Sequence, residues 1–172
     1  LTVDEDIECV SMITVAGTSR LRRVATYDAF TGGRGFPTTR AELAAFDVVI
    51  LSNIARASLT SEQLDWLEGW VANRGGGLAL LGGPKAFGQG NWGETPLAPI
   101  LPVDFSNERW DENAEIVAGP LEEMIRHPVW ALVSAREQNE SILKAMPAAR
   151  GLHLGMKAKA GIPGAGGFSK DV

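Results

Sequence analysis

The segment from residue 46 to residue 83 constrains the fold of this chain more than any other. Residues 48–51 form a continuous apolar run between polar or small neighbours, which is typical of a strand buried on both faces. Thr60 and Gln63 then form a capping box, which marks the start of a helix. A second apolar run at residues 78–81 predicts another strand.

The helix that starts at Thr60 has clear limits. Leu59 and Leu64 are placed to form a hydrophobic staple around its cap. Residues 75–77 are all glycine and can adopt the left-handed conformation of a C-cap, so the helix is predicted to end near Arg74. A strand, a helix and a second strand within so short a stretch form a βαβ unit, whose two strands run parallel.

Weaker signals extend this α/β pattern towards the N-terminus. Residues 10–15 are a further strand candidate. Thr39 and Glu42 are spaced to cap a short helix that runs through Phe46. No internal repeat is evident, and the alternation of strands and helices predicts the α/β class with a parallel centre to the sheet.

Two helix signals lie in the C-terminal part of the chain. Pro120 suits the first turn of a helix over residues 121–126. Ser134 and Glu137 predict the start of another helix, which should end before Pro147.

Three segments lack periodicity and are predicted to be irregular, namely residues 31–37, 87–102 and 161–168. The middle segment combines glycines with a tryptophan and several prolines, which favours an ordered loop lying over the sheet edge. We expect residues 1–172 to form a single domain, in which residues 161–172 are a mobile, glycine-rich tail.

The composition restricts the classes of partner. With 172 residues, of which 45% are hydrophobic, the chain is long enough to bury one sizeable core. A net charge of -5 offers no basic surface for phosphates, so we expect no nucleic-acid partner. No apolar run approaches the roughly 18 residues that span a bilayer, so we expect no direct membrane insertion.

The compartment stays open between cytoplasmic and extracytoplasmic. Cys9 is the only cysteine, which excludes an internal disulfide and any CxxC metal or redox site. The chain begins at Leu1 rather than methionine and ends in glycine-rich sequence. We expect a piece of a larger protein, with neighbouring domains or an oligomer as its context.

Four passages carry a resemblance to a known family. They read FDVVILSNI (residues 46–54), LTSEQLDWLEGWVANRGGGLALLGGPKAFGQGNWGETPLAPILPV (residues 59–103), HPVW (residues 127–130) and NESILKAMPAARGLH (residues 139–153). Together they resemble the bacterial class I glutamine amidotransferase-like domains that often stand beside von Willebrand factor A domains or membrane segments. The resemblance covers residues 37–159. Its most specific part is the series of strand, helix, three glycines, strand, two glycines and an aromatic-glycine loop followed by LPV.

The resemblance implies a flavodoxin-like α/β fold, a three-layer sandwich with a mainly parallel central sheet. It also implies where a catalytic cysteine would stand, at the turn directly after the strand of residues 78–81. This chain has Gly82 and Gly83 there, and neither carries a side chain. Cys9 lies far upstream, on or beside a strand, and we expect it to be a small buried hydrophobe.

The histidines do not supply the missing chemistry. Amide hydrolysis through a thioester needs a thiolate, a histidine and an acid that orients the histidine. His127 and His153 are not spaced against a carboxylate as in the family's histidine-x-glutamate pair, so we expect structural or surface roles for both. No G-x-S-x-G elbow occurs and Ser52 has no marked partner, so we expect no catalytic residue.

A ligand site is expected at the carboxyl ends of the strands, as is general for open parallel sheets. The candidate residues are Ser52, Asn53, Gly82, Gly83, Lys85, Asn91 and Trp92. Backbone N–H groups of the glycine turn could bind a carboxylate or another anion, with Lys85 adding positive charge. The alternative is that the glycines only permit a tight turn and close packing.

No cofactor and no metal are expected. Residues 88–93 match G-x-G-x-x-G by letter, but they neither follow a strand directly nor open a helix, as the dinucleotide fingerprint requires. Asp111, Glu112 and Glu115 are interpreted as an acidic surface loop without an organised set of ligands.

The tryptophans suggest both packing and recognition. Trp66 and Trp70 lie on the capped helix, where their spacing favours packing. Trp92 and Trp110 lie in predicted loops and are candidates for an interface.

Three functional hypotheses follow. The first is an amidotransferase-like domain without the catalytic cysteine and histidine, which binds a small ligand or a protein partner at the strand ends. The second is a hydrolase or amidotransferase of unrecognised mechanism, which uses Ser52, Asn53, Lys85 or a bound water in the same cleft. The third is a purely structural part of a larger assembly.

Overall fold

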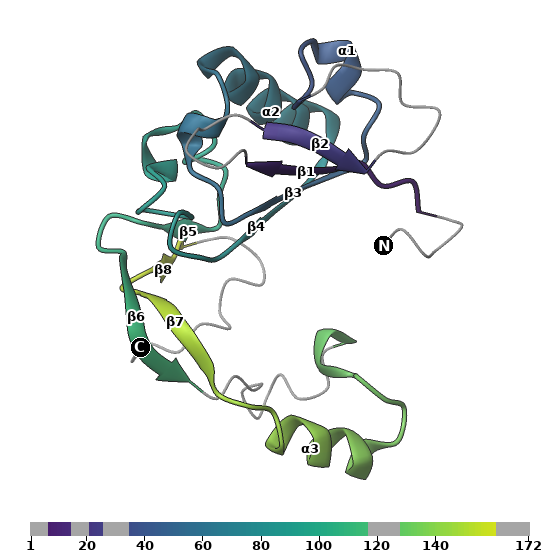
Figure 1. The fold of residues 1–172 in the computed structure, drawn as a ribbon, viewed down its shortest axis with the longest axis vertical. Coiled ribbons are helices and arrows are strands. Elements are labelled where there is room, and N and C mark those ends of the chain that lie inside the picture. Colours follow the sequence, from purple (N-terminus) through teal and green to yellow (C-terminus); the bar gives the residue numbers. More distant parts are fainter. Residues whose placement is uncertain (1–6, 15–20, 26–34, 117–127, 161–172) are drawn as a thin grey trace. The chain divides into compact units, whose positions relative to one another are not determined.

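The computed structural model describes residues 7–14, 21–25, 35–116 and 128–160 (Figure 1). The chain divides into two compact units, Leu1–Leu101 and Pro102–Val172. The predicted helix over residues 121–126 and the predicted tail of residues 161–172 lie outside the described residues.

The first unit contains the predicted βαβ crossover (Figure 1). β3 (Val48–Ser52) runs parallel to β4 (Gly77–Leu81), with Ser52 opposite Leu81. α2 (Ser61–Arg74) connects the two strands. The carboxyl ends of β3 and β4 therefore lie side by side, which confirms the parallel arrangement predicted from the two apolar runs.

Both ends of α2 follow the sequence signals. The Thr60 hydroxyl accepts the N–H of Gln63 over 3.1 Å, and Gln63 Oε1 accepts the N–H of Thr60 over 2.9 Å, which completes the predicted capping box. After the helix, Gly75 adopts a φ of 76°, and a Cβ on Gly76 would come within 2.3 Å of the Trp70 ring. Glycine is therefore required here both for the left-handed backbone and for the close approach of the indole.

α1 is shorter than predicted. It spans Arg40–Leu43, with the predicted cap in which the Thr39 hydroxyl accepts the N–H of Glu42 over 3.1 Å. The helix does not continue through Phe46, because the N–H of Phe46 bonds to the carbonyl of Leu43, only three residues back. This tighter bonding closes the helix in a turn before β3.

β1 (Ser11–Thr14) confirms the strand predicted within residues 10–15. It pairs antiparallel with β2 (Leu21–Ala25). The sequence signals do not predict β2, because Arg22 and Arg23 interrupt its apolar character.

The prediction that the strand of residues 48–51 (β3) is buried on both faces is wrong. Val48, Ile50 and Leu81 are 57%, 50% and 50% exposed. Because side chains alternate along a strand, these three lie on the face opposite Leu51, which is buried. The structure is thus α/β, but its parallel strand pair has one face covered by described residues and one open apolar face.

The segment of residues 87–102 is ordered, as predicted. It forms a series of turns with one short 3-10 helix, η2 (Trp92–Glu94). Trp92, Leu97 and Leu101 from this segment are buried in the core of the first unit. The interpretation of Trp92 as an exposed interface residue is wrong, since its side chain is only 1% exposed.

The second unit is built on antiparallel pairs (Figure 1). β6 (Arg109–Ile116) pairs with β7 (Ala149–Leu154), and β5 (Val103–Asp104) pairs with β8 (Lys157–Ala158). The unit also holds the short 3-10 helix η4 (Pro128–Trp130). Across the described parts of both units, no helix has the length and apolar character that crossing a bilayer requires.

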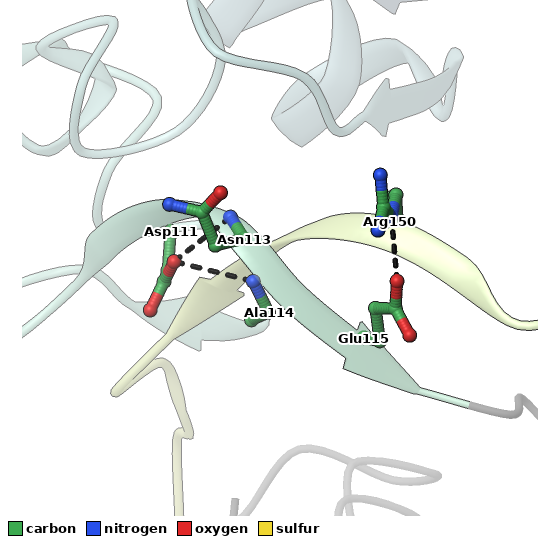
Figure 2. Close-up of polar contacts among 5 residues, drawn as sticks. All are labelled: Asp111, Asn113, Ala114, Glu115 and Arg150. Carbon is green, nitrogen blue, oxygen red and sulfur yellow. Dashed lines mark hydrogen bonds and ion pairs between the residues drawn. The ribbon is translucent and has the colours of Figure 1, made fainter.

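The acidic residues predicted to form a surface loop lie within β6 instead (Figure 2). Asp111 Oδ1 accepts the N–H groups of Asn113 and Ala114 over 3.0 and 3.2 Å, and the strand register shifts at this point. Glu115 pairs with Arg150 across the two strands, at 2.5 Å between Oε1 and Nε. The sequence does not predict this strand, because its residues are mostly charged and the groups that pair with them, a local turn and a cross-strand arginine, are visible only in the structure.

α3 (Arg136–Lys144) ends before the next proline, as predicted, but Ser134 does not cap it. Asn139 organises its N-terminal side from within the helix. The Asn139 Oδ1 accepts the N–H of Leu132 over 2.8 Å, and Nδ2 donates to the carbonyl of Trp130 over 2.9 Å. This buried amide holds the preceding chain in place, so a capping serine is not needed.

Candidate functional site

Two loops meet at the carboxyl ends of β3 and β4, and Asn53 joins them. Asn53 follows β3 and donates its backbone N–H to the carbonyl of Leu81 over 3.1 Å. Its side-chain Oδ1 accepts the backbone N–H of Lys85 over 2.9 Å. The loop after β3 is thereby tied to the loop after β4, at the place where the sequence predicts a ligand site.

Gly83 faces the Asn53 side chain in this turn. Gly83 has a φ of +148°, and a Cβ built on it would lie 2.5 Å from both Cγ and Oδ1 of Asn53. No side chain fits at position 83 while Asn53 keeps its place. Close packing therefore explains this glycine, which is the alternative that the sequence leaves open beside anion binding.

A second pair of hydrogen bonds holds the same two loops together. The indole N–H of Trp92 donates to the carbonyl of Ile54 over 2.8 Å. The backbone N–H of Arg56, which opens the short 3-10 helix η1 (Arg56–Ser58), donates to the carbonyl of Gly90 over 2.9 Å. Trp92 is thus a buried support of the loops, and its N–H already has an acceptor.

The backbone of these loops is unusual. Asn53, Phe87 and Asn91 have φ values of 48°, 50° and 58°, and they are the only non-glycine residues with positive φ among those the structure describes. Asparagine tolerates this region, whereas a bulky residue such as Phe87 adopts it at a cost of about 1 kcal/mol or more. Strained residues of this kind cluster at binding and catalytic sites, so their concentration here supports the predicted location.

The predicted ligand residues are brought together in these loops. Trp92 is the one among them whose side chain is buried. Ser52, Asn53, Gly82, Lys85 and Asn91 are exposed, and Gly83 is half-buried. The prediction of a ligand site at these positions remains a prediction, now with a defined local geometry.

Arg56 is a residue of this region that the sequence reasoning missed. It lies in η1, four positions after the end of β3. The sequence signal that could have identified Arg56 is the lack of acidic neighbours, since no aspartate or glutamate occurs from residue 48 to residue 61. A cation in an acid-free loop after a strand is a candidate anion ligand even without a recognised motif.

The second unit contains a buried ionisable pair that the sequence did not reveal. His153 Nδ1 lies 2.5 Å from Glu108 Oε1, and their side chains are 5% and 0% exposed. The His153 ring also packs against Trp110, with ring centroids 4.8 Å apart. The sequence spacing does not reveal this partner, because the pairing of β6 with β7 brings Glu108 to His153 from 45 residues away. The enclosure of both side chains indicates a structural role.

The remaining candidates for chemistry are few. Cys9 is half-buried rather than buried, and its Sγ lies 3.7 Å from the hydroxyl of Ser11. His127 lies outside the described residues. Within the described ranges, no three His, Cys, Asp or Glu side chains are grouped in a way that suits a metal ion.

The comparisons with known proteins agree with the resemblance seen in the sequence. The model of the family described as "Putative glutamine amidotransferase" matches residues 13–143. No curated protein and no solved structure matches the chain. The family match covers most of the sequence, including the whole βαβ crossover and both loops at its strand ends. The chain therefore belongs to the putative glutamine amidotransferase family.

Proposed function

We propose that this chain is a non-catalytic glutamine amidotransferase-like domain, which binds a small ligand or a protein partner at the carboxyl ends of β3 and β4. The single observation that carries the proposal is the contact between Gly83 and Asn53. A side chain at position 83 would overlap Asn53, whose Oδ1 is already bonded to the N–H of Lys85. At position 83 of the turn where the family resemblance would place a nucleophile, the Asn53 amide takes the space of a side chain, which supports the proposal.

The chemistry of the two loops supports the same conclusion. Amide hydrolysis needs a nucleophile and a base within hydrogen-bonding distance of each other. Residues 52–58 and 82–92 include no cysteine, histidine, aspartate or glutamate. A hydrolase of unrecognised mechanism in this cleft would have to recruit its base from another part of the chain.

The proposal extends to the finer architecture. We place both compact units in a single domain with a three-layer, flavodoxin-like arrangement and a mainly parallel central sheet. The family match supports this, because it runs from the first unit into the second without interruption. The apolar side chains of Val48, Ile50 and Leu81 favour a covering layer, since parallel strands are normally buried on both faces.

The experiment that tests the proposed function is a glutaminase assay on the intact chain. We expect ammonia release from glutamine to equal the buffer rate, because no thiolate stands at the strand end. The Cys9→Ser variant is the control, since it removes the only thiol. Turnover above the buffer rate that disappears in Cys9→Ser or in Asn53→Ala would show that the domain is an enzyme and overturn the proposal.

A further inference from the structure

One buried polar atom near the strand ends is unsatisfied. Among the residues that the structure describes, Nε of Arg56 is the only buried side-chain nitrogen or oxygen without a hydrogen-bond partner. Buried N–H donors are rarely left without an acceptor, because burial removes the hydrogen bond to water and leaving the donor unbonded costs free energy. An unsatisfied cationic donor therefore calls for an explanation in terms of what it binds.

Gly90 links the backbone of Arg56 to that of Lys85. The backbone N–H of Arg56 is bonded to the carbonyl of Gly90 over 2.9 Å. Gly90 also packs so tightly against Lys85 that a Cβ on it would lie 2.4 Å from the Lys85 carbonyl oxygen. The backbones of Arg56 and Lys85, from two different loops, thus approach the same glycine.

The sequence segments that contain Arg56 and Lys85 carry no negative charge. No aspartate or glutamate occurs from residue 48 to residue 61, and none occurs from residue 69 to residue 93. The whole chain nevertheless has a net charge of -5, so the two loops are a cationic region in an acidic protein. Within the loops, Arg56 and Lys85 have no acidic neighbour in sequence that could neutralise them.

We propose that the strand-end site binds the oxyanion group of a small ligand, with Arg56 as its main donor and Lys85 as its second cation. This inference rests on the proposed function, because it takes the ligand site to lie between these loops. The guanidinium offers several N–H donors in a planar fork, which matches the paired oxygens of a carboxylate or a phosphate. Binding would add a charge-assisted hydrogen bond to the guanidinium, and it would also satisfy Nε once the atoms that cover Nε move aside.

The test measures the melting temperature of the intact chain during titration with an anion. The two probes are inorganic phosphate and succinate, each compared with potassium chloride at matched ionic strength. We expect a saturable rise in melting temperature with at least one probe, because a ligand that binds only the folded state stabilises it. The probe that acts at the lower concentration identifies the oxyanion as phosphate or carboxylate.

Variants at position 56 separate ligand binding from a structural role. Arg56→Met keeps the length of the side chain and removes every donor, so the anion-dependent rise should disappear. Without added anion, Arg56→Met should melt at the same temperature as the original chain or above it, because an unsatisfied buried donor has been removed. Arg56→Lys should bind at least about tenfold more weakly, since it retains charge without the fork. Arg74→Met, at the end of α2, is the charge-matched control and should keep the full response.

Several results would overturn the inference. A rise that potassium chloride reproduces, or one that Arg56→Met and Arg74→Met weaken equally, would mean that the anions act through general screening. A marked loss of melting temperature in Arg56→Met without added anion would mean that Arg56 is structural. The glutaminase assay is independent of all these readouts, so failure of the anion site and failure of the non-catalytic proposal can be told apart.

Discussion

Asn53 and Gly83 act as a pair, in which one side chain occupies the space that the other residue leaves. The amide of Asn53 reaches over Gly83 to bond the N–H of Lys85, and this requires that position 83 carry no Cβ. The pair therefore sets the shape of the strand-end turn more than either residue does alone.

This pairing predicts a specific pattern of stability changes. Gly83→Ala should lower the free energy of unfolding by about 2 kcal/mol or more, because the new Cβ must displace Asn53 and the backbone has a φ that alanine disfavours. In the Asn53→Ala background the same change should cost less, by at least about 0.5 kcal/mol, because Cγ and Oδ1 are gone and only the Cβ of residue 53, at 2.7 Å, still overlaps. Denaturant unfolding of the two single variants and the double variant measures this coupling. Strictly additive costs would contradict the proposed contact.

A second prediction concerns the pKa of Asp104. The hydroxyl of Ser106 lowers this pKa most, the backbone N–H of Ser106 adds to the effect over 2.9 Å, and Lys159 and Lys157 contribute positive charge. Because the pKa is lower in the folded chain, the stabilising contribution is present above the unfolded pKa and is lost as pH falls through the folded pKa. Ser106→Ala should raise the pKa of Asp104 towards its ordinary value, as followed by NMR titration of the carboxyl carbon.

The control for this titration is Ser134→Ala, a serine in the same unit that does not cap α3. It should leave the titration of Asp104 unchanged. A pKa for Asp104 that does not move in Ser106→Ala would show that the backbone N–H and the lysines, rather than the hydroxyl, dominate.

At the scale of elements, α2 depends on its N-terminal cap. Thr60→Ala should cost about 1 kcal/mol of unfolding free energy, because the N–H of Gln63 loses its acceptor at the first turn of the helix. Thr60→Ser keeps the hydroxyl and should stay close to the original stability. Urea unfolding followed by far-ultraviolet circular dichroism measures both. Equal losses in the two variants would indicate that the methyl group of Thr60, rather than the cap, stabilises the helix.

The elements that the sequence predicts well are those with local signals. The capping box of Thr60 and Gln63, the left-handed Gly75 and the two apolar runs all act within a few residues, so βαβ connectivity can be derived without a structure. The antiparallel pairing of β6 with β7 has no such signal. It depends on residues far apart in the chain, and its charged strand lacks apolar alternation.

In the candidate site, too, some features follow from local sequence signals and others depend on the tertiary structure. That Ser52, Asn53 and Lys85 meet at one sheet edge follows from the parallel strands. The burial of Trp92 and the unsatisfied Nε of Arg56 do not, because they depend on how the two loops fold back on each other. Side-chain burial in a loop is a tertiary property that composition and spacing cannot specify.

At the scale of the whole molecule, the open face of β3 and β4 tests the proposed three-layer arrangement. If a further layer covers this face, Ile50→Thr should cost more than about 1 kcal/mol, although Ile50 is 50% exposed in the first unit. Ile13→Thr in β1 is a matched control, since Ile13 is 52% exposed and also lies in a strand. The control should stay within about 0.5 kcal/mol, which is usual for surface positions. Equal small effects on thermal unfolding would indicate that the face is open to solvent.

The contact between Asn53 and position 83 also determines the order in which this sequence could acquire a reactive thiol. A cysteine introduced at position 83 alone would collide with the amide, so a mutational path that begins there passes through a destabilised intermediate, as expected for Gly83→Ala. A path that first shortens Asn53 removes the collision with Cγ and Oδ1 but gives up the hydrogen bond to the N–H of Lys85. Neither single step is free of cost, so a thiol at position 83 with a stable turn would require at least two substitutions.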